Sequence, residues 1–302
     1  MMNSLEQALS VPAPSAGCAA PRRTFLLAGA AALLAGACRP PARTPDGRVV
    51  ENGSLEWAAL QPGRIEPERD YWRHPVEMLR FWGVEPGMTV LQILPGRGWL
   101  TAVLAPYLER GGGKLIAAQF DPVNSSPARR ATVDYFDAHF ADERRYGAIE
   151  RAVISNRPSV LALPDTVDVA IMSNVMQTLL AMHAAERVLG QVFEALKPGG
   201  VLGIEQHRAA ASGVVDPIAS SGYVQEAFVK ALAEEIGFEF VAASDVNANP
   251  RDTRDHPFGV WTLPPTLRTA PLGEPDNPDF DSTPYREIGE SDRMTLKLRK
   301  PQ

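Results

Sequence analysis

A glycine-rich segment, Pro95-Gly-Arg-Gly98, separates an apolar run at 89–94 from a helical pattern. Glycine lets the backbone approach a bound group closely, and the start of a helix presents unpaired N–H groups. We therefore expect Pro95, Gly96 and Gly98 to bind a nucleotide-like ligand. Two glycines alone are weak support, because a tight structural turn needs the same residues. The third glycine of a dinucleotide fingerprint would fall at Thr101, which disfavours NAD and a nicotinamide-dependent oxidoreductase.

Glu205 and His207 stand at the end of another apolar run, at 201–206, and a strand there would place both side chains on one face. Parallel sheets bind ligands at the carboxyl ends of their strands. A carboxylate or an imidazole at that edge can take a proton from an oxygen or nitrogen nucleophile, so we expect both residues to be catalytic. A structural alternative stays open, in which Glu205 pairs with Arg208 or another arginine and His207 only caps a loop.

A polar cluster and three aromatic residues are further candidates for a substrate site. The polar side chains follow the sixth expected strand, and clusters of this kind often only satisfy loop backbone. The aromatic residues would suit a flat or apolar substrate, although isolated aromatics also serve as core or loop anchors. The polar set is Asn247, Asn249, Arg251, Asp252 and His256, and the aromatic set is Trp72, Tyr223 and Trp261.

Alternating apolar runs and helical patterns must position these residues. Near-continuous apolar strands between helices predict an α/β fold, in which a doubly wound, mostly parallel sheet is covered on both faces. We expect seven strands in a single domain at 66–302. The expected strands are 89–94, 115–120, 149–154, 168–173, 201–206, 238–243 and 294–298, and the expected helices are 75–82, the stretch from the glycine-rich turn to 109, 128–140, 184–196 and 225–236.

The composition excludes several classes of protein. The chain has 302 residues, with 30 Lys and Arg against 36 Asp and Glu, for a formal charge of −6. This balance offers no polybasic footprint for DNA or RNA, so we expect no nucleic-acid partner. The two cysteines, Cys18 and Cys38, are too few for a disulfide framework or a multi-cysteine zinc site. The five histidines show no ligand spacing, so we expect no metal.

Residues 1–37 have the pattern of an export signal peptide. Arg22-Arg23 precede an apolar run at 25–37, which is shorter than the ~20 residues that a bilayer span needs. The paired arginines resemble the twin-arginine signal that exports folded proteins. Ordinary cleavage after Ala37 and a lipoprotein box ending at Cys38 would cut the same bond. We expect a protein of the periplasm or cell envelope, attached to a membrane only through a lipid on Cys38, with a proline-rich tether and lead-in at 38–65.

Three segments, in order and at familiar separations, resemble class I S-adenosylmethionine-dependent methyltransferases: Val90–Thr101, the strand at Asp168, and Ala195–Leu202. The resemblance covers roughly residues 66–300, and it implies a Rossmann-like methyltransferase fold and S-adenosylmethionine as cofactor. More narrowly, the chain resembles a bacterial group of exported predicted methyltransferases, whose acceptor is undefined. The segments that match this group are Arg69–Pro75, Ile204–Ala209, Ser221–Val224, Asn247–Pro257, Gly259–Pro265 and Asp292–Leu296.

The sequence departs from the family pattern where the cofactor would bind. Gln92 and Gln119 stand where the family usually has an acid, and Leu94 stands where it usually has glycine. The acid at the position of Gln119 normally accepts two hydrogen bonds from the ribose. We therefore expect Gln119 to contribute to a weakened cofactor site, with Asp121 as a partial substitute. Asn174 matches the residue that the exported group carries after the fourth strand, so we expect it in the cofactor site too.

Together these features predict an S-adenosylmethionine-dependent methyltransferase that acts on a small molecule. In-line methyl transfer depends mostly on positioning, and an oxygen or nitrogen acceptor must also lose a proton, which is the role expected of Glu205 or His207. Because of the departures, a non-catalytic ligand-binding protein on the same fold is the alternative.

Overall fold

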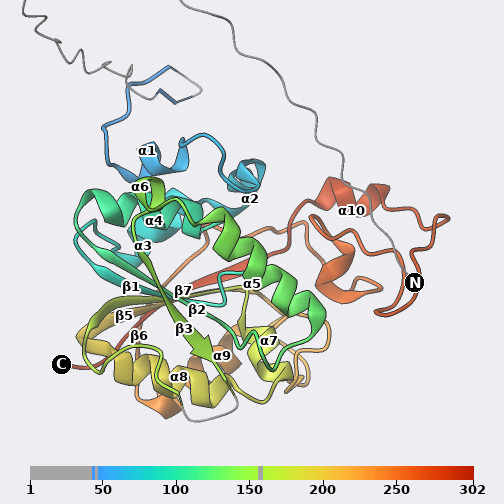
Figure 1. Cartoon of the computed structure of the whole chain (residues 1–302). Helices are drawn as coiled ribbons and strands as arrows, with labels where there is room; N and C mark the ends of the chain where they lie inside the picture. Colours follow the sequence, from blue (N-terminus) through green and yellow to red (C-terminus); the bar gives the residue numbers. More distant parts are fainter. Residues whose placement is uncertain (1–42, 45–46, 156–158) are drawn as a thin grey trace, which may run out of the picture. The chain divides into compact units, whose positions relative to one another are not determined.

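A computed structural model describes residues 43–44, 47–155 and 159–302 of the chain. The expected export signal at 1–37 and the expected lipidation site Cys38 lie outside these residues. The described part contains one seven-stranded sheet, with helices on both of its faces (Figure 1). This is the α/β, doubly wound fold that the sequence predicts.

The strand order in the sheet is β3-β2-β1-β4-β5-β7-β6. The first five strands in this order run parallel, whereas β7 is antiparallel to both of its neighbours. The chain therefore reverses its direction of winding at β1, and the carboxyl ends of β1, β4 and β5 lie side by side. The strands are β1 (Thr89–Ile93), β2 (Lys114–Phe120), β3 (Ile149–Ile154), β4 (Val167–Ser173), β5 (Leu196–His207), β6 (Glu239–Ser244) and β7 (Arg293–Arg299).

Helices cover each face of the sheet and bury one apolar cluster apiece. Residues of α1, α3, α4 and α5 contribute to the cluster on one face, and residues of α7, α8 and α9 to the cluster on the other. The α-helices are α1 (Leu55–Ala59), α2 (Asp70–Arg73), α3 (Pro75–Trp82), α4 (Thr101–Arg110), α5 (Pro127–His139), α6 (Glu143–Tyr146), α7 (Met176–Ala181), α8 (Ala185–Ala195), α9 (Glu226–Ile236) and α10 (Thr283–Ile288), and two 3₁₀ turns span Pro67–Arg69 and Gly259–Thr262.

Helix α3 is fixed to the sheet through Trp82, which is fully buried. The indole Nε1–H of Trp82 donates a 2.9 Å hydrogen bond to the carbonyl of Leu296 on β7. A Cβ at Gly203 on β5 would lie only 2.4 Å from the indole ring, so only glycine lets the ring lie against the sheet. Residues two and four positions further along β5, Glu205 and His207, face the same side as Gly203.

The packed domain begins earlier than residue 66, where the sequence analysis placed its start. Leu55 and Ala58 of α1 are buried, as is Ile65, and all three belong to the apolar cluster beneath α3 and α4. The lead-in part of the expected segment 38–65 therefore packs on the domain. Strand β5 also begins at Leu196, before the expected residue 201. Within the described residues, no helix combines the length and apolar character that crossing a membrane requires.

Candidate functional site

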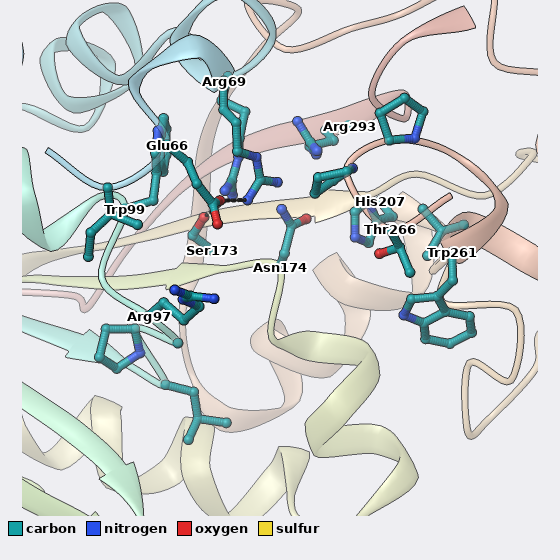
Figure 2. A pocket seen from close by; sticks show the side chains of 18 residues that line it. Glu66, Arg69, Arg97, Trp99, Ser173, Asn174, His207, Trp261, Thr266 and Arg293 are labelled. Carbon is teal, nitrogen blue, oxygen red and sulfur yellow. Dashed lines mark hydrogen bonds and ion pairs between the residues drawn. The ribbon is translucent and has the colours of Figure 1, made fainter. Parts of the chain in front are cut away.

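A cavity of about 340 Å³ opens at the carboxyl ends of β1, β4 and β5. Figure 2 shows Arg97 and Trp99 on one side of this cavity, and Trp261 and Thr266 on the opposite side. The lining comes from six segments that are far apart in the sequence. Its residues are Ile65, Glu66, Arg69, Arg73, Leu94, Pro95, Gly96, Arg97, Trp99, Ser173, Asn174, His207, Val260, Trp261, Pro264, Pro265, Thr266 and Arg293.

The two glycines of the glycine-rich loop have different roles. Gly96 lines the cavity with a φ of 60°, and a Cβ built there would meet no atom within 4 Å, so its backbone faces open space. Gly98 has a φ of 97°, and a Cβ there would lie 2.2 Å from Cε2 of Phe140. Pro95 and Gly96 are thus placed to meet a ligand. Gly98 is required by packing on Phe140 and does not line the cavity.

Leu94 precedes the loop and adopts a φ of 45°, in the left-handed region that favours glycine. This geometry explains why the family pattern has glycine at that position. Gln92, the other departure on β1, accepts a 2.8 Å hydrogen bond from the hydroxyl of Thr101. That bond ties β1 to α4 and gives Gln92 a structural role.

Glu205 lies beneath the cavity and has no solvent exposure. The register of β4 and β5 places it beside Ser173, whose hydroxyl donates a hydrogen bond to the carboxylate. The carboxylate also lies 3.0 Å from Nη2 of Arg73 and 3.3 Å from Nε of Arg293. Burial acts to raise the pKa of Glu205, but the charges of Arg73 and Arg293 outweigh it and hold the pKa below its usual value.

This environment does not suit the catalytic role expected of Glu205. A carboxylate with a lowered pKa is a weak base, and Glu205 is absent from the cavity lining. The geometry favours the structural alternative, in its form with arginines other than Arg208. Glu205 forms ion pairs with Arg73 and Arg293, whereas Arg208 forms a bidentate ion pair with Asp292.

His207 lines the cavity at the end of β5, as expected of a residue that contacts substrate. Its Nδ1 is 2.6 Å from the hydroxyl oxygen of Ser291. Burial, together with the nearby charges of Arg293 and Arg73, lowers the pKa of His207 well below its usual value. The imidazole is therefore neutral at pH 7. Because Ser291 contacts Nδ1, the other ring nitrogen, Nε2, can form a hydrogen bond with a ligand.

Asn174 also lines the cavity, immediately after β4, with a φ of 51° that asparagine tolerates better than most residues. Its backbone N–H donates to the carbonyl of Glu205 at 2.8 Å. The side-chain Oδ1 is buried and accepts no hydrogen bond. Because an unsatisfied buried acceptor is costly, this oxygen is suited to receive a donor from a bound ligand.

A second cavity, of about 260 Å³, opens at the carboxyl ends of β2 and β3. Asp121 lines it and accepts hydrogen bonds from the backbone of Val123 and from the side chain of Asn124. Gln119 is buried with Nε2 unpaired and lines neither cavity. Of the two residues expected at the ribose, only Asp121 thus reaches a cavity. The second cavity is lined by Phe120, Asp121, Asn124, Ser125, Arg129, Ile154, Ser155 and Met182.

The polar cluster after β6 is mostly occupied with protein partners. Asn249 donates to the carbonyls of Ile288 and Glu290, and Asp252 accepts from Tyr223 and contacts His256. These bonds tie the segment after β6 to the chain that enters β7. Of the three candidate aromatic residues, Trp261 lines the main cavity, whereas Trp72 lies under Gly289 and Tyr223 is buried.

Three arginines at the main cavity were given no role by the sequence analysis. Arg69 pairs with Glu290 across 221 positions, Arg73 lies over the ring of Trp99 at 4.2 Å, and Arg293 pairs with Glu290 and Glu205. The sequence offered one indication of their importance. All three lie in segments that match the exported group: Arg69, Arg73 and Arg293. No cluster of His, Cys, Asp or Glu suited to a metal ion occurs in the described part of the chain.

No protein-family model matches the chain, and no curated protein matches it. Solved structures do match it. A methyltransferase dependent on S-adenosylmethionine from Aquifex aeolicus is 20% identical, with 60% of this chain and 88% of that one covered at a TM-score of 0.48. The [4+2]-cyclase SpnF is 17% identical, with 80% of this chain and 86% of that one covered at a TM-score of 0.51. Phosphoethanolamine N-methyltransferase 2 from Haemonchus contortus, in complex with S-adenosylmethionine, is 15% identical, with 76% and 53% covered at a TM-score of 0.47.

At these identities the comparisons concern the fold. The described part of the chain has an α/β, Rossmann-like fold, with a seven-stranded mixed sheet in a single domain, and the matched structures share this fold. One of the matched structures bears the name of a cyclase. The fold alone therefore does not fix the reaction, which has to be argued from the site.

Proposed function

We propose that this protein binds S-adenosylmethionine and transfers its methyl group to a small acceptor. The observation that carries the proposal is the pair of cavities at the carboxyl ends of the parallel strands of one sheet, one after β2 and β3 and the other after β1, β4 and β5. Doubly wound sheets bind nucleotide-like ligands at this edge, where the winding reverses. A ligand with a nucleoside end and an amino-acid end has polar groups for both cavities.

The residues present fit this ligand. Asp121 in the second cavity is the carboxylate that would accept hydrogen bonds from ribose hydroxyls. In the main cavity, the open backbone at Gly96 and the unpaired Oδ1 of Asn174 suit the amino-acid end. When bound, S-adenosylmethionine supplies an electrophilic methyl group, and the protein's task is to position an acceptor in line with it.

His207 is the residue placed to accept a hydrogen bond from an oxygen or nitrogen acceptor, whereas its lowered pKa makes the imidazole too weak a base to keep the acceptor's proton. It lines the cavity, is neutral at pH 7, and has its ring held through Nδ1 by Ser291. Arg73 and Arg293 lower its pKa, and Glu205 holds both arginines in place. In this assignment Glu205 is a positioning residue and His207 contacts the acceptor.

Equilibrium dialysis with radiolabelled S-adenosylmethionine tests the assignment. Asp121→Asn should weaken binding about tenfold, because it removes a charge-assisted acceptor while keeping an oxygen for the turn. Asp216→Asn is the matched control, since Asp216 also accepts from nearby backbone N–H groups but lies outside both cavities. Equal affinities in all three proteins would contradict the assignment of the second cavity.

A non-catalytic binding protein is the second candidate, and the placement of Glu205 and Gln119 favours it. Neither residue reaches a cavity, although Glu205 was expected to be catalytic and Gln119 to contribute to the cofactor site. Incubation with labelled S-adenosylmethionine and a small-molecule extract of bacterial cells separates the two functions. An enzyme moves the label into a new small product, whereas a binding protein leaves it in the cofactor.

We also propose that the protein is exported and anchored by a lipid on Cys38. The support is in the sequence, where Arg22-Arg23 precede a short apolar run that ends at Ala37-Cys38. The variant Cys38→Ala keeps the small residues at the cleavage site, so it should turn a membrane-bound protein into a soluble exported one. Wild-type protein with an unmodified Cys38 in the periplasmic fraction would contradict the anchor, and an uncleaved cytoplasmic protein would contradict export.

A further inference from the structure

The wall of the main cavity contains arginine N–H groups without partners. Arg293 is 1% exposed; its Nε forms an ion pair with Glu205 at 3.3 Å, but its Nη1 donates no hydrogen bond within the protein. Arg73 is 6% exposed, and its Nε is likewise unpaired. Both side chains line the cavity. A buried charged donor without an acceptor is costly, so these groups are suited to an oxygen atom that arrives with a ligand.

The charges around the cavity do not balance among its enclosed groups. Arg69, Arg73 and Arg293 carry three positive charges, and the buried carboxylates Glu205 and Glu290 carry two negative ones. One unit of positive charge is therefore left in a setting where solvent screens it weakly.

Two further charged groups face the cavity from its mouth. The side chain of Glu66 is 36% exposed and pairs with Arg69, and Arg97 is exposed on the glycine-rich loop. Their charges cancel, and both are screened by water. The lowered pKa of His207 agrees with a positive cavity, since Arg293 and Arg73 both contribute to it after burial.

We propose that the acceptor carries an oxyanion, a carboxylate or a phosphate, which accepts hydrogen bonds from Arg293 and Arg73. A planar guanidinium presents several N–H groups in a geometry that matches either anion. Trp261 and Thr266 also line the cavity (Figure 2), so the remainder of the molecule can lie against an aromatic ring. That this anion belongs to the methyl acceptor rests on the proposed function, whereas the anion site itself does not.

Titration of the wild-type full-length protein with benzoate and with inorganic phosphate, followed by tryptophan fluorescence, tests the site directly. Trp99 and Trp261 both line the cavity and provide the signal. At least one anion should bind at millimolar concentration, and the anion that binds more tightly identifies the group as carboxylate or phosphate. A wild-type protein that binds neither overturns the proposal, and this measurement depends on no variant.

Arg293→Lys should weaken the binding of that anion at least about tenfold, because lysine keeps the charge but loses the planar set of donors. Arg208→Lys is the matched control. Arg208 also pairs with a buried carboxylate at this sheet edge, but it lies outside the cavity. The control should bind within about threefold of wild type. Equal losses in both variants would show a general structural effect and overturn the assignment to Arg293.

S-adenosylmethionine itself carries a carboxylate, so its use of the same arginines must be separated. S-adenosylhomocysteine has this carboxylate, and 5′-methylthioadenosine lacks it. If Arg293→Lys weakens the first but not the second, Arg293 binds the cofactor, and the acceptor proposal is wrong. If neither nucleoside binds any of the proteins while benzoate or phosphate still does, the proposed function fails and the anion site stands.

Discussion

Replacing Glu205 by glutamine should destabilise the domain strongly. The side chain is fully buried between Arg73 and Arg293, and glutamine keeps its shape and the hydrogen bond from Ser173 while removing the charge. Breaking a buried ion pair from one side costs about 3–5 kcal/mol. For a domain of this size, each kcal/mol lowers the melting temperature by about 2–4 °C. The expected loss is therefore about 6–20 °C.

Thermal unfolding followed by circular dichroism at pH 7 measures this loss. Glu239→Gln is the matched control, because Glu239 also pairs with an arginine from the sheet, Arg299, but both side chains are about half exposed. Surface pairs of this kind contribute about 0–1 kcal/mol, so the control should melt within a few degrees of wild type. If Glu205→Gln melts like the control and yet abolishes turnover, our structural account of Glu205 is wrong, and the base role expected from the sequence is restored.

Three further predictions concern pH and the glycine-rich loop. His207 stays neutral in the folded state, whereas in the unfolded chain it takes up a proton near pH 6.5. The free energy of unfolding should therefore decrease as the pH drops below 6.5. His207→Asn should remove this decrease in denaturant titrations. Burial opposes ionisation of Glu290, but Arg293 and Arg69 hold its pKa at about 2. Glu290 therefore contributes about 3 kcal/mol to the free energy of unfolding above pH 4.5, and this contribution is lost as the pH falls toward 2. An acid limb unchanged in Glu290→Gln would contradict this. Gly98→Ala should unfold at far lower denaturant than Gly96→Ala, because only its Cβ would meet Phe140; equal midpoints would refute the packing role.

The sheet was predictable because its strands are short apolar runs bounded by glycine and proline. The glycine-rich turn and the position of His207 followed from the same pattern, since parallel strands bring their carboxyl ends to one edge. Helix α1 was missed because its five residues, Leu55–Ala59, are too few to show a helical period.

The charge cluster could not be predicted, because it depends on contacts between distant segments. Arg69 and Glu290 are 221 positions apart, and Arg73 and Glu205 are 132 apart. The sequence shows that Glu205 lies near the end of a strand, but not that Arg73 and Arg293 form ion pairs with it. Gln119 illustrates the same limit, because the alternation along β2 did not show that its buried side chain lines neither cavity.

Isothermal titration calorimetry of the full-length protein with S-adenosylhomocysteine tests the central claim most directly. We predict one site with a dissociation constant on the order of 10–1000 μM, weak because Asp121 already accepts hydrogen bonds from Val123 and Asn124 and substitutes only in part for a ribose-binding acid. Gly96→Asn should abolish the binding, because asparagine tolerates the left-handed backbone while its side chain enters the open space of the cavity. Absence of heat from both S-adenosylhomocysteine and S-adenosylmethionine at millimolar concentration, with no protection of the wild-type protein from melting, would contradict the account.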